Sequence, residues 1–301
     1  MTPKNKSIEE VLKKRKKKRR IIPATLMMMA VILCLLLFLN QDLNSAPSKE
    51  TFLNTGASKV EGGSSLSLSS YPEGSALSKI SLTAQTNPRY LTILENSNQY
   101  PDELLTSLSQ NDELLNFTLG YPECKGTSVS GSDASDVVEN GVPLYLQWDP
   151  RWGYLPYGNS IIGLSGCGPT CFSMVVTALT KDDSNTPDKM AQFSSENGFK
   201  SKDDGTDSSI FTSGVQLLGL SSKSLSMSSE KELTDALQSG ALLVCNLGPG
   251  DFTKRGHYIV IRGYENGEFL VNDPNSKTRS QTTWSFDRLL PQVITIYAIS
   301  A

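Results

Sequence analysis

Four side chains of the sequence could together carry out nucleophilic catalysis: Cys167, His257, Asp273 and Gln147. Cys167 comes directly before Gly168-Pro169, a pair typical of a helix start, where free backbone amides and the helix dipole stabilise a thiolate. His257 is the only histidine, so an imidazole base must be this residue. Asp273 could orient the imidazole and stabilise its cationic form.

Gln147 could stabilise the negative charge that develops on a substrate oxygen. It ends the short apolar run VPLYLQ, and its neutral amide could donate a hydrogen bond to that oxygen beside the backbone N–H of Cys167. The aromatic residues that follow it, Trp148, Trp152 and Tyr154, are candidates to line a substrate cleft.

Cys167 and Cys171 lie four residues apart in GLSGCGPTCFSM, a spacing open to a disulfide, half a metal site, a redox couple or one reactive thiol. Cys171 begins a run of apolar residues at helical spacing, which continues through Met174, Val175, Ala178 and Leu179, and such a run indicates a buried helix face. Cysteines one helical turn apart rarely meet disulfide geometry. We therefore expect Cys167 to be the reactive thiol and Cys171 a core residue; the alternative is that both are structural.

A metal site is not expected. Cys167, Cys171 and His257 offer three ligands, but no CxxC motif or second histidine supports a tetrahedral zinc site. We accordingly predict no metal and no cofactor.

The elements that must position these side chains belong to an α+β domain over residues 142–301. Helical spacing predicts a buried helix at 169–179 and a short one at 229–237. Strands are expected at 241–248 and 292–300, and a β-hairpin at 257–274. A helix followed by strands in this order favours an α+β fold.

The hairpin decides whether His257 and Asp273 can meet. A three-residue loop at 265–267 pairs Ile259 with Asp273 and places His257 on the same face, one diagonal away. A two-residue turn shifts the register by one and puts them on opposite faces. The triad therefore predicts the three-residue loop.

Residues 1–39 predict membrane targeting. Residues 4–20 hold ten Lys or Arg and two Glu, a local charge of +8 in a chain whose formal charge is −3. The uncharged, apolar stretch from Ile21 to Leu39 follows, long enough to cross a bilayer. Basic residues before the span keep the N-terminus cytoplasmic. We favour an uncleaved signal anchor; the alternative is secretion after signal cleavage.

The expected organisation has six parts: a basic cytoplasmic tail (1–20), a transmembrane anchor (21–39), a Ser-rich flexible stalk (40–86), a short helical segment (87–122), a linker (123–141) and the domain at 142–301. The remainder beyond the basic tail carries a charge of −11, which argues against nucleic acid as a partner.

Five motifs in this order resemble one family: Gln147-x-Asp149-x-x-Trp152, Tyr157-Gly158, Gly166-Cys167-Gly168-Pro169-Thr170, Gly256-His257-Tyr258 and Asn272-Asp273-Pro274. Residues 142–301 are similar to the extracytoplasmic peptidase C-39-like domains of bacteria, relatives of the double-glycine leader peptidases fused to bacteriocin exporters, within the papain-like cysteine peptidases. The helical segment at 87–122 also resembles one found before such domains in Gram-positive proteins.

The resemblance implies a papain-like fold, in which the helix carrying the nucleophile packs on an antiparallel sheet. It also implies Cys167 as nucleophile, His257 as base, Asp273 as orienting acid and Gln147 as oxyanion donor. The exporter peptidases space the glutamine and the cysteine more closely, so residues 148–165 must loop out and return. No transporter segments follow, so leader cleavage coupled to export is not expected.

The sequence therefore predicts a cysteine peptidase anchored in the membrane of a Gram-positive bacterial cell, with its catalytic domain outside and a peptide or protein as substrate. The alternatives are a noncatalytic cell-surface binding module on the same scaffold, and an amidase or acyltransferase acting on cell-wall peptide. The helical segment could be a spacer, an inhibitory cover of the cleft or a docking surface.

Overall fold

The computed structural model describes residues 71–130, 137–139, 141–201, 205–226 and 229–301. The predicted tail and membrane span (1–39) lie outside these residues, as does the predicted stalk up to residue 70. Within the described ranges, no helix combines the length and the apolar character that a membrane crossing requires.

A six-stranded antiparallel sheet forms the centre of the domain, in the order β5-β10-β6-β7-β8-β9. Its strands are β5 (Ser221–Leu225), β6 (Leu242–Leu247), β7 (His257–Glu265), β8 (Glu268–Asn272), β9 (Thr283–Trp284) and β10 (Val293–Ser300). Two short hairpins stand apart from it: β1 (Val137–Glu139) with β2 (Val142–Leu144), and β3 (Pro156–Tyr157) with β4 (Ser160–Ile161).

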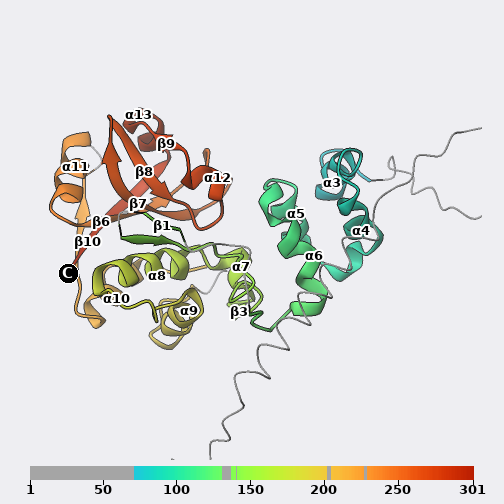
Figure 1. The fold of residues 1–301 in the computed structure, drawn as a ribbon, viewed down its shortest axis with the longest axis horizontal. Coiled ribbons are helices and arrows are strands. Elements are labelled where there is room, and N and C mark those ends of the chain that lie inside the picture. The colour runs from blue at the N-terminus through green and yellow to red at the C-terminus, as the bar shows by residue number, and fades with distance from the viewer. Residues whose placement is uncertain (1–70, 131–136, 140, 202–204, 227–228) are drawn as a thin grey trace, which may run out of the picture. The chain divides into compact units, whose positions relative to one another are not determined.

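Helices cover both faces of the sheet (Figure 1). One face packs against α8 (Cys167–Thr180), which α9 (Pro187–Glu196) and α10 (Ser213–Leu217) flank. The other face carries α11 (Glu230–Gln238) and α13 (Phe286–Leu289). The expected α+β class with an antiparallel sheet is confirmed, because α8, α11, β6, the hairpin and β10 all form where the sequence predicts them.

Two strands of the sheet, β5 and β9, are not predicted by the sequence patterns. β5 reads SSKSL and is a mostly polar edge strand, so it lacks the apolar alternation by which strands are recognised. β9 is only two residues long. Both lie at the edges of the sheet, where short strands and charged side chains such as Lys223 discourage pairing with another chain.

A helical region, defined here as residues 76–124, precedes the sheet domain. It consists of α3 (Ala76–Ala84), α4 (Arg89–Glu95), α5 (Asp102–Leu108) and α6 (Leu115–Cys124), with 3-10 turns η2 (Ser97–Gln99) and η3 (Asp112–Leu114). It begins earlier than the segment expected at 87–122, since α3 lies within the range expected to be a stalk. The reason is packing: Ile80 and Ala84 of α3 are buried in the core of this region.

The β7–β8 hairpin has the predicted strand pairing but a different turn. Its turn has two residues, Asn266 and Gly267, both in the left-handed region (φ 54° and 86°). The expectation of a three-residue loop is therefore wrong, because Asn-Gly strongly favours a two-residue turn. An irregularity between Ile261 and Gly263 then places one extra residue in β7, and this bulge shifts the register back by one.

The strand beyond the bulge consequently pairs as the sequence analysis required. Val260 lies opposite Asn272, so the next step along the two strands brings Ile259 opposite Asp273. His257 and Asp273 thus come to the same face of the hairpin despite the shorter turn.

Candidate active site

Cys167 is the first residue of α8, and Gly166 caps that helix. A side chain at Gly166 would lie 2.5 Å from the carbonyl oxygen of Ile162, so only glycine fits this turn. Pro169 loses no hydrogen bond, because the first four amides of a helix have no partner within it. The sequence therefore starts the helix at the cysteine, and the Cys167 thiol is half-buried beside free backbone amides.

His257 begins β7 and is buried at 7 % exposure, while Asp273 follows β8 and is fully buried. The His257 Nε2 atom lies 2.8 Å from Asp273 Oδ1. Cys167 lies close enough to His257 to help raise the pKa of its imidazole, and since Nε2 faces the aspartate, Nδ1 is the ring nitrogen available to the sulfur. The structure thus brings three of the four predicted residues into one chain of contacts.

Asp273 is held by more partners than the sequence suggested. Its Oδ1 accepts a second hydrogen bond from the Asn275 backbone N–H at 2.8 Å, and its Oδ2 accepts from Arg279 Nε at 2.5 Å. The backbone N–H of Asp273 donates to Ser280 Oγ at 2.8 Å. Arg279 and Ser280 lie on the four-residue helix α12 (Lys277–Ser280), and no sequence pattern distinguishes Arg279 from a solvated arginine.

These contacts determine the charge of the pair. Burial lowers the pKa of His257, but the charge of Asp273, its hydrogen bond and Cys167 together raise that pKa to about 10, from 6.5. Burial raises the pKa of Asp273, but His257 and Arg279 lower it below its usual value. At neutral pH the site therefore holds an imidazolium against an ionised carboxylate.

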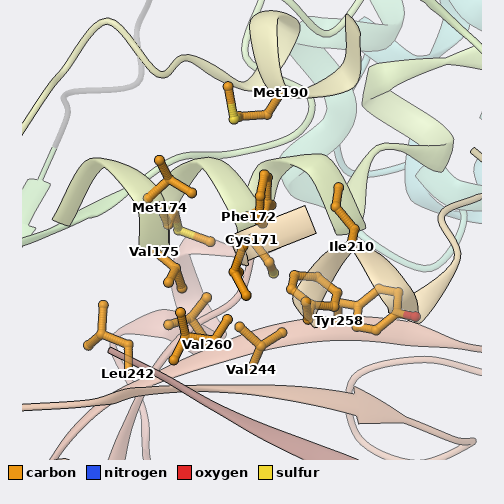
Figure 2. Close-up of a cluster of buried hydrophobic side chains, with 14 of the residues drawn as sticks. Cys171, Phe172, Met174, Val175, Met190, Ile210, Leu242, Val244, Tyr258 and Val260 are labelled. Carbon is orange, nitrogen blue, oxygen red and sulfur yellow. The ribbon is translucent and has the colours of Figure 1, made fainter. Parts of the chain in front are cut away.

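Cys171 lies one turn further along α8, on its buried face (Figure 2). The close-up shows its side chain directed toward the sheet, among residues such as Val244 and Val260. Burial raises the pKa of the Cys171 thiol well above its ordinary value, so this cysteine stays neutral. Burial likewise raises the pKa of Cys245, on β6, to about 12.

All four described cysteines, Cys124, Cys167, Cys171 and Cys245, are free thiols. Across the described ranges, no group of three or more His, Cys, Asp or Glu side chains is arranged to hold a metal ion.

The loop between β8 and α12, residues 273–276, is called the aspartate loop below. Gln147 lies between this loop and the turn that leads to Cys167. Its backbone N–H donates to the Pro274 carbonyl at 2.7 Å, and its Nε2 donates to the Gly163 carbonyl at 3.0 Å. Only one of the two amide hydrogens is needed for that bond. Its buried Oε1 has no hydrogen-bond partner among the described residues.

Residues 148–165 loop out and return, as the long spacing between Gln147 and Cys167 requires. The loop holds the hairpin of β3 and β4 and the short helix α7 (Ile162–Ser165), and Gly163 N–H closes it on the Gly153 carbonyl at 2.8 Å. The three aromatic candidates for a cleft lining, Trp148, Trp152 and Tyr154, are 8 % exposed or less. They pack in the hydrophobic cores and offer little surface to a substrate.

A thiol at a helix start, beside a histidine that a buried carboxylate holds, defines the class of site found in cysteine peptidases. The model of the Peptidase_C39 like family matches residues 139–298, more than half of the chain, and the chain therefore belongs to this family. Membership of this family suggests peptidase activity.

Several solved structures are similar to this chain, among them the following two. One, assigned as a C39-like peptidase from Bacillus anthracis, is 15% identical, with a TM-score of 0.37 over 56% of this chain and 98% of its own. The other is the peptidase domain of Streptococcus ComA, a bi-functional ABC transporter involved in a quorum sensing pathway; it is 19% identical, with a TM-score of 0.33 over 44% of this chain and 89% of its own. No curated protein sequence matches the chain.

Proposed function

We propose that this protein is a membrane-anchored cysteine peptidase that hydrolyses peptide bonds outside the cytoplasm. The observation that carries the proposal is the contact chain from Cys167 through His257 to the fully buried Asp273. Burying a carboxylate is costly, because the ion loses its hydration. Here its charge stabilises the imidazolium that a thiol nucleophile requires.

The reaction has two halves. Cys167 Sγ attacks the carbonyl carbon of the substrate amide, and the proton of the thiol is held on His257. The imidazolium gives that proton to the leaving nitrogen as the C–N bond breaks, which leaves a thioester on Cys167. Water then attacks the thioester, His257 takes a proton from the water, and the free acid leaves as the thiol is regenerated.

Two groups are assigned to the oxyanion of each tetrahedral intermediate. The backbone N–H of Cys167 is one, at the start of α8. The second amide hydrogen of Gln147 is the other, since its first is bound to Gly163. Donors that are already oriented stabilise the developing charge without reorganising during the reaction. Asp273 remains ionised throughout and keeps the imidazole in one orientation.

The membrane location rests on the sequence alone. The basic run at 4–20 and the apolar stretch at 21–39 support a single span with a cytoplasmic N-terminus. Under this proposal the catalytic domain meets extracellular or cell-wall peptides, and the thiols operate in an oxidising compartment.

Peptide-library profiling by mass spectrometry tests the activity, using the detergent-solubilised full chain. We expect the wild type to cleave a subset of peptides and Cys167→Ala to cleave none. Cys124→Ala is the matched control, because Cys124 is a partly exposed thiol in the helical region, and it should cleave like the wild type.

Two results would redirect the assignment. A wild type that neither cleaves peptides nor labels at Cys167 with thiol probes would be a noncatalytic binding module. Turnover of purified wall peptides alone would instead identify a cell-wall amidase or acyltransferase. Cleavage that survives Cys167→Ala would refute the proposed mechanism.

A further inference from the structure

In the helical region, Glu113 of η3 makes three hydrogen bonds to the aspartate loop and to the start of α12. Its Oε1 accepts a hydrogen bond from Ser276 Oγ at 2.5 Å, and its Oε2 accepts from the Lys277 backbone N–H at 2.7 Å. A longer bond of 3.3 Å joins Oε1 to the Thr278 backbone N–H. These residues lie more than 160 positions further along the chain, so the contact is purely tertiary.

Glu113 supplies what the short helix α12 cannot supply itself. A helix of four residues is too short to be stable alone, because its nucleation cost exceeds the gain from so few hydrogen bonds. Its first amides also have no partners within the helix. Glu113 accepts from the first two, on Lys277 and Thr278, and Ser276 Oγ accepts from the third, on Arg279, at 3.0 Å. A carboxylate at the N-terminal end of a helix also interacts favourably with the helix dipole.

The helix that Glu113 caps holds the carboxylate of the candidate active site. Arg279 Nε binds Asp273 Oδ2, and Ser280 Oγ accepts from the Asp273 N–H. Arg279 is further fixed over the ring of Phe252, with its Cζ 5.9 Å from the ring centre. Displacement of α12 would therefore release one carboxylate oxygen and the backbone of Asp273 together.

Further contacts fix the helical region against this loop. Asn111 Nδ2 donates to the Asn275 carbonyl at 2.7 Å, and Trp148 Nε1 donates to the same oxygen at 3.2 Å. Leu114, next to Glu113, is fully buried in a hydrophobic cluster that also contains Leu146 and Trp148. The position of Glu113 is thus set by packing on both sides, and its carboxylate has little freedom to move.

We propose that Glu113 is a positioning residue of the peptidase site, and that the helical region is a structural part of that site. This inference rests on the proposed function. Glu113 caps α12, α12 orients Asp273 through Arg279 and Ser280, and Asp273 orients His257. The helical region is accordingly more than a spacer.

The test measures how fast iodoacetamide alkylates Cys167 between pH 5 and 10, with the site resolved by peptide mass spectrometry, in the full chain. This readout needs no peptide substrate. In Glu113→Ala we expect the rate at pH 6 to fall about ten-fold, the effect of losing one charge-assisted hydrogen bond. The alkaline end of the profile should move to lower pH, because a less well oriented Asp273 stabilises the imidazolium less.

Three further variants make the result specific. Glu113→Gln keeps one acceptor oxygen and should show a smaller loss, which also serves if Glu113→Ala folds poorly. Glu95→Gln is the matched control, an exposed acid on α4 of the same region, and should behave as the wild type. Adding Glu113→Ala to Arg279→Ala should cause less further loss than Glu113→Ala causes alone, because part of the effect of Glu113 passes through Arg279.

The outcomes separate the two proposals. If Glu113→Ala melts at a lower temperature but keeps the wild-type profile, Glu113 is only a helix cap and the inference is overturned. If the wild type cleaves no peptide while its Cys167 profile responds to Glu113 as expected, the proposed function fails and the positioning role stands.

Discussion

Replacing Asp273 by asparagine removes the charge of the candidate site while it keeps the shape of the side chain. The carboxylate accepts from His257 and Asn275 on one oxygen and from Arg279 on the other. An amide can present only one acceptor oxygen. Whichever way the asparagine turns, at least one of these donors then faces an amide NH2 and is left unpaired.

The size of the effect follows from the distance between the charges. At 2.8 Å and an effective dielectric constant of about 20, two unit charges attract by about 6 kcal/mol. That corresponds to about four pKa units, and it is opposed by the burial that lowers the pKa of His257. Without Asp273 the burial remains, so the pKa should fall from about 10 to 6.5 or lower.

The single histidine allows a direct assay. In protein labelled with 15N-histidine, every imidazole signal comes from His257, and its shifts report both protonation and tautomer as the pH is varied. We expect the wild type to stay cationic through pH 8 and Asp273→Asn to titrate at or below the ordinary pKa. Peptidase activity should fall by about 10² to 10⁴ in kcat.

A control removes a charge of the same kind elsewhere. Asp235→Asn breaks an exposed ion pair with Lys231 on α11 and should leave the His257 titration unchanged, because exposed pairs contribute little. An Asp273→Asn protein whose imidazole still titrates near pH 10 would refute the reasoning.

Three further predictions concern the same site. In the folded protein the pKa of His257 is raised from 6.5 to about 10, and that of Asp273 is lowered from 3.8. The contribution of the pair to the free energy of unfolding is therefore complete between about pH 4 and 6.5, and it is lost as the pH rises toward 10. The difference in melting temperature between the wild type and His257→Gln should follow that course. Gln147→Ala should lower kcat by about 10² to 10³ with little change in KM, as loss of an oxyanion donor does, and a KM effect alone would contradict its assignment. Cys171→Ala should keep kcat within about two-fold while it costs about 1 to 2 kcal/mol of stability in denaturant unfolding, the effect of a small buried cavity.

The hairpin shows where sequence reasoning succeeds and where it stops. The pairing of β7 with β8 could be predicted because His257 and Asp273 had to share a face. The turn was predicted wrongly, since that argument assumed a regular ladder. The bulge between Ile261 and Gly263 that reconciles the Asn-Gly turn with the pairing depends on packing against both faces, which local sequence does not encode.

The residues that hold Asp273 in place could not be predicted from the sequence for a related reason. Arg279 and Glu113 are single charged residues, with nothing in their neighbours to mark them as supports of Asp273. Their roles arise only when the helical region packs beside α12. Cys167 and Cys171 could be told apart because helix periodicity is a local signal, and the structure buries Cys171 as that signal predicts.

The central claim is that Cys167 attacks the substrate carbonyl and carries the acyl group as a thioester. Rapid acid quenching of the wild type with a cleaved peptide, followed by mass spectrometry, measures this directly. The account predicts an added mass equal to the acyl half of the substrate on the peptide containing Cys167, and a larger amount when His257→Gln slows hydrolysis of an activated peptide ester. Cleavage with no such adduct, or an adduct on Cys171 or Cys124, would contradict it.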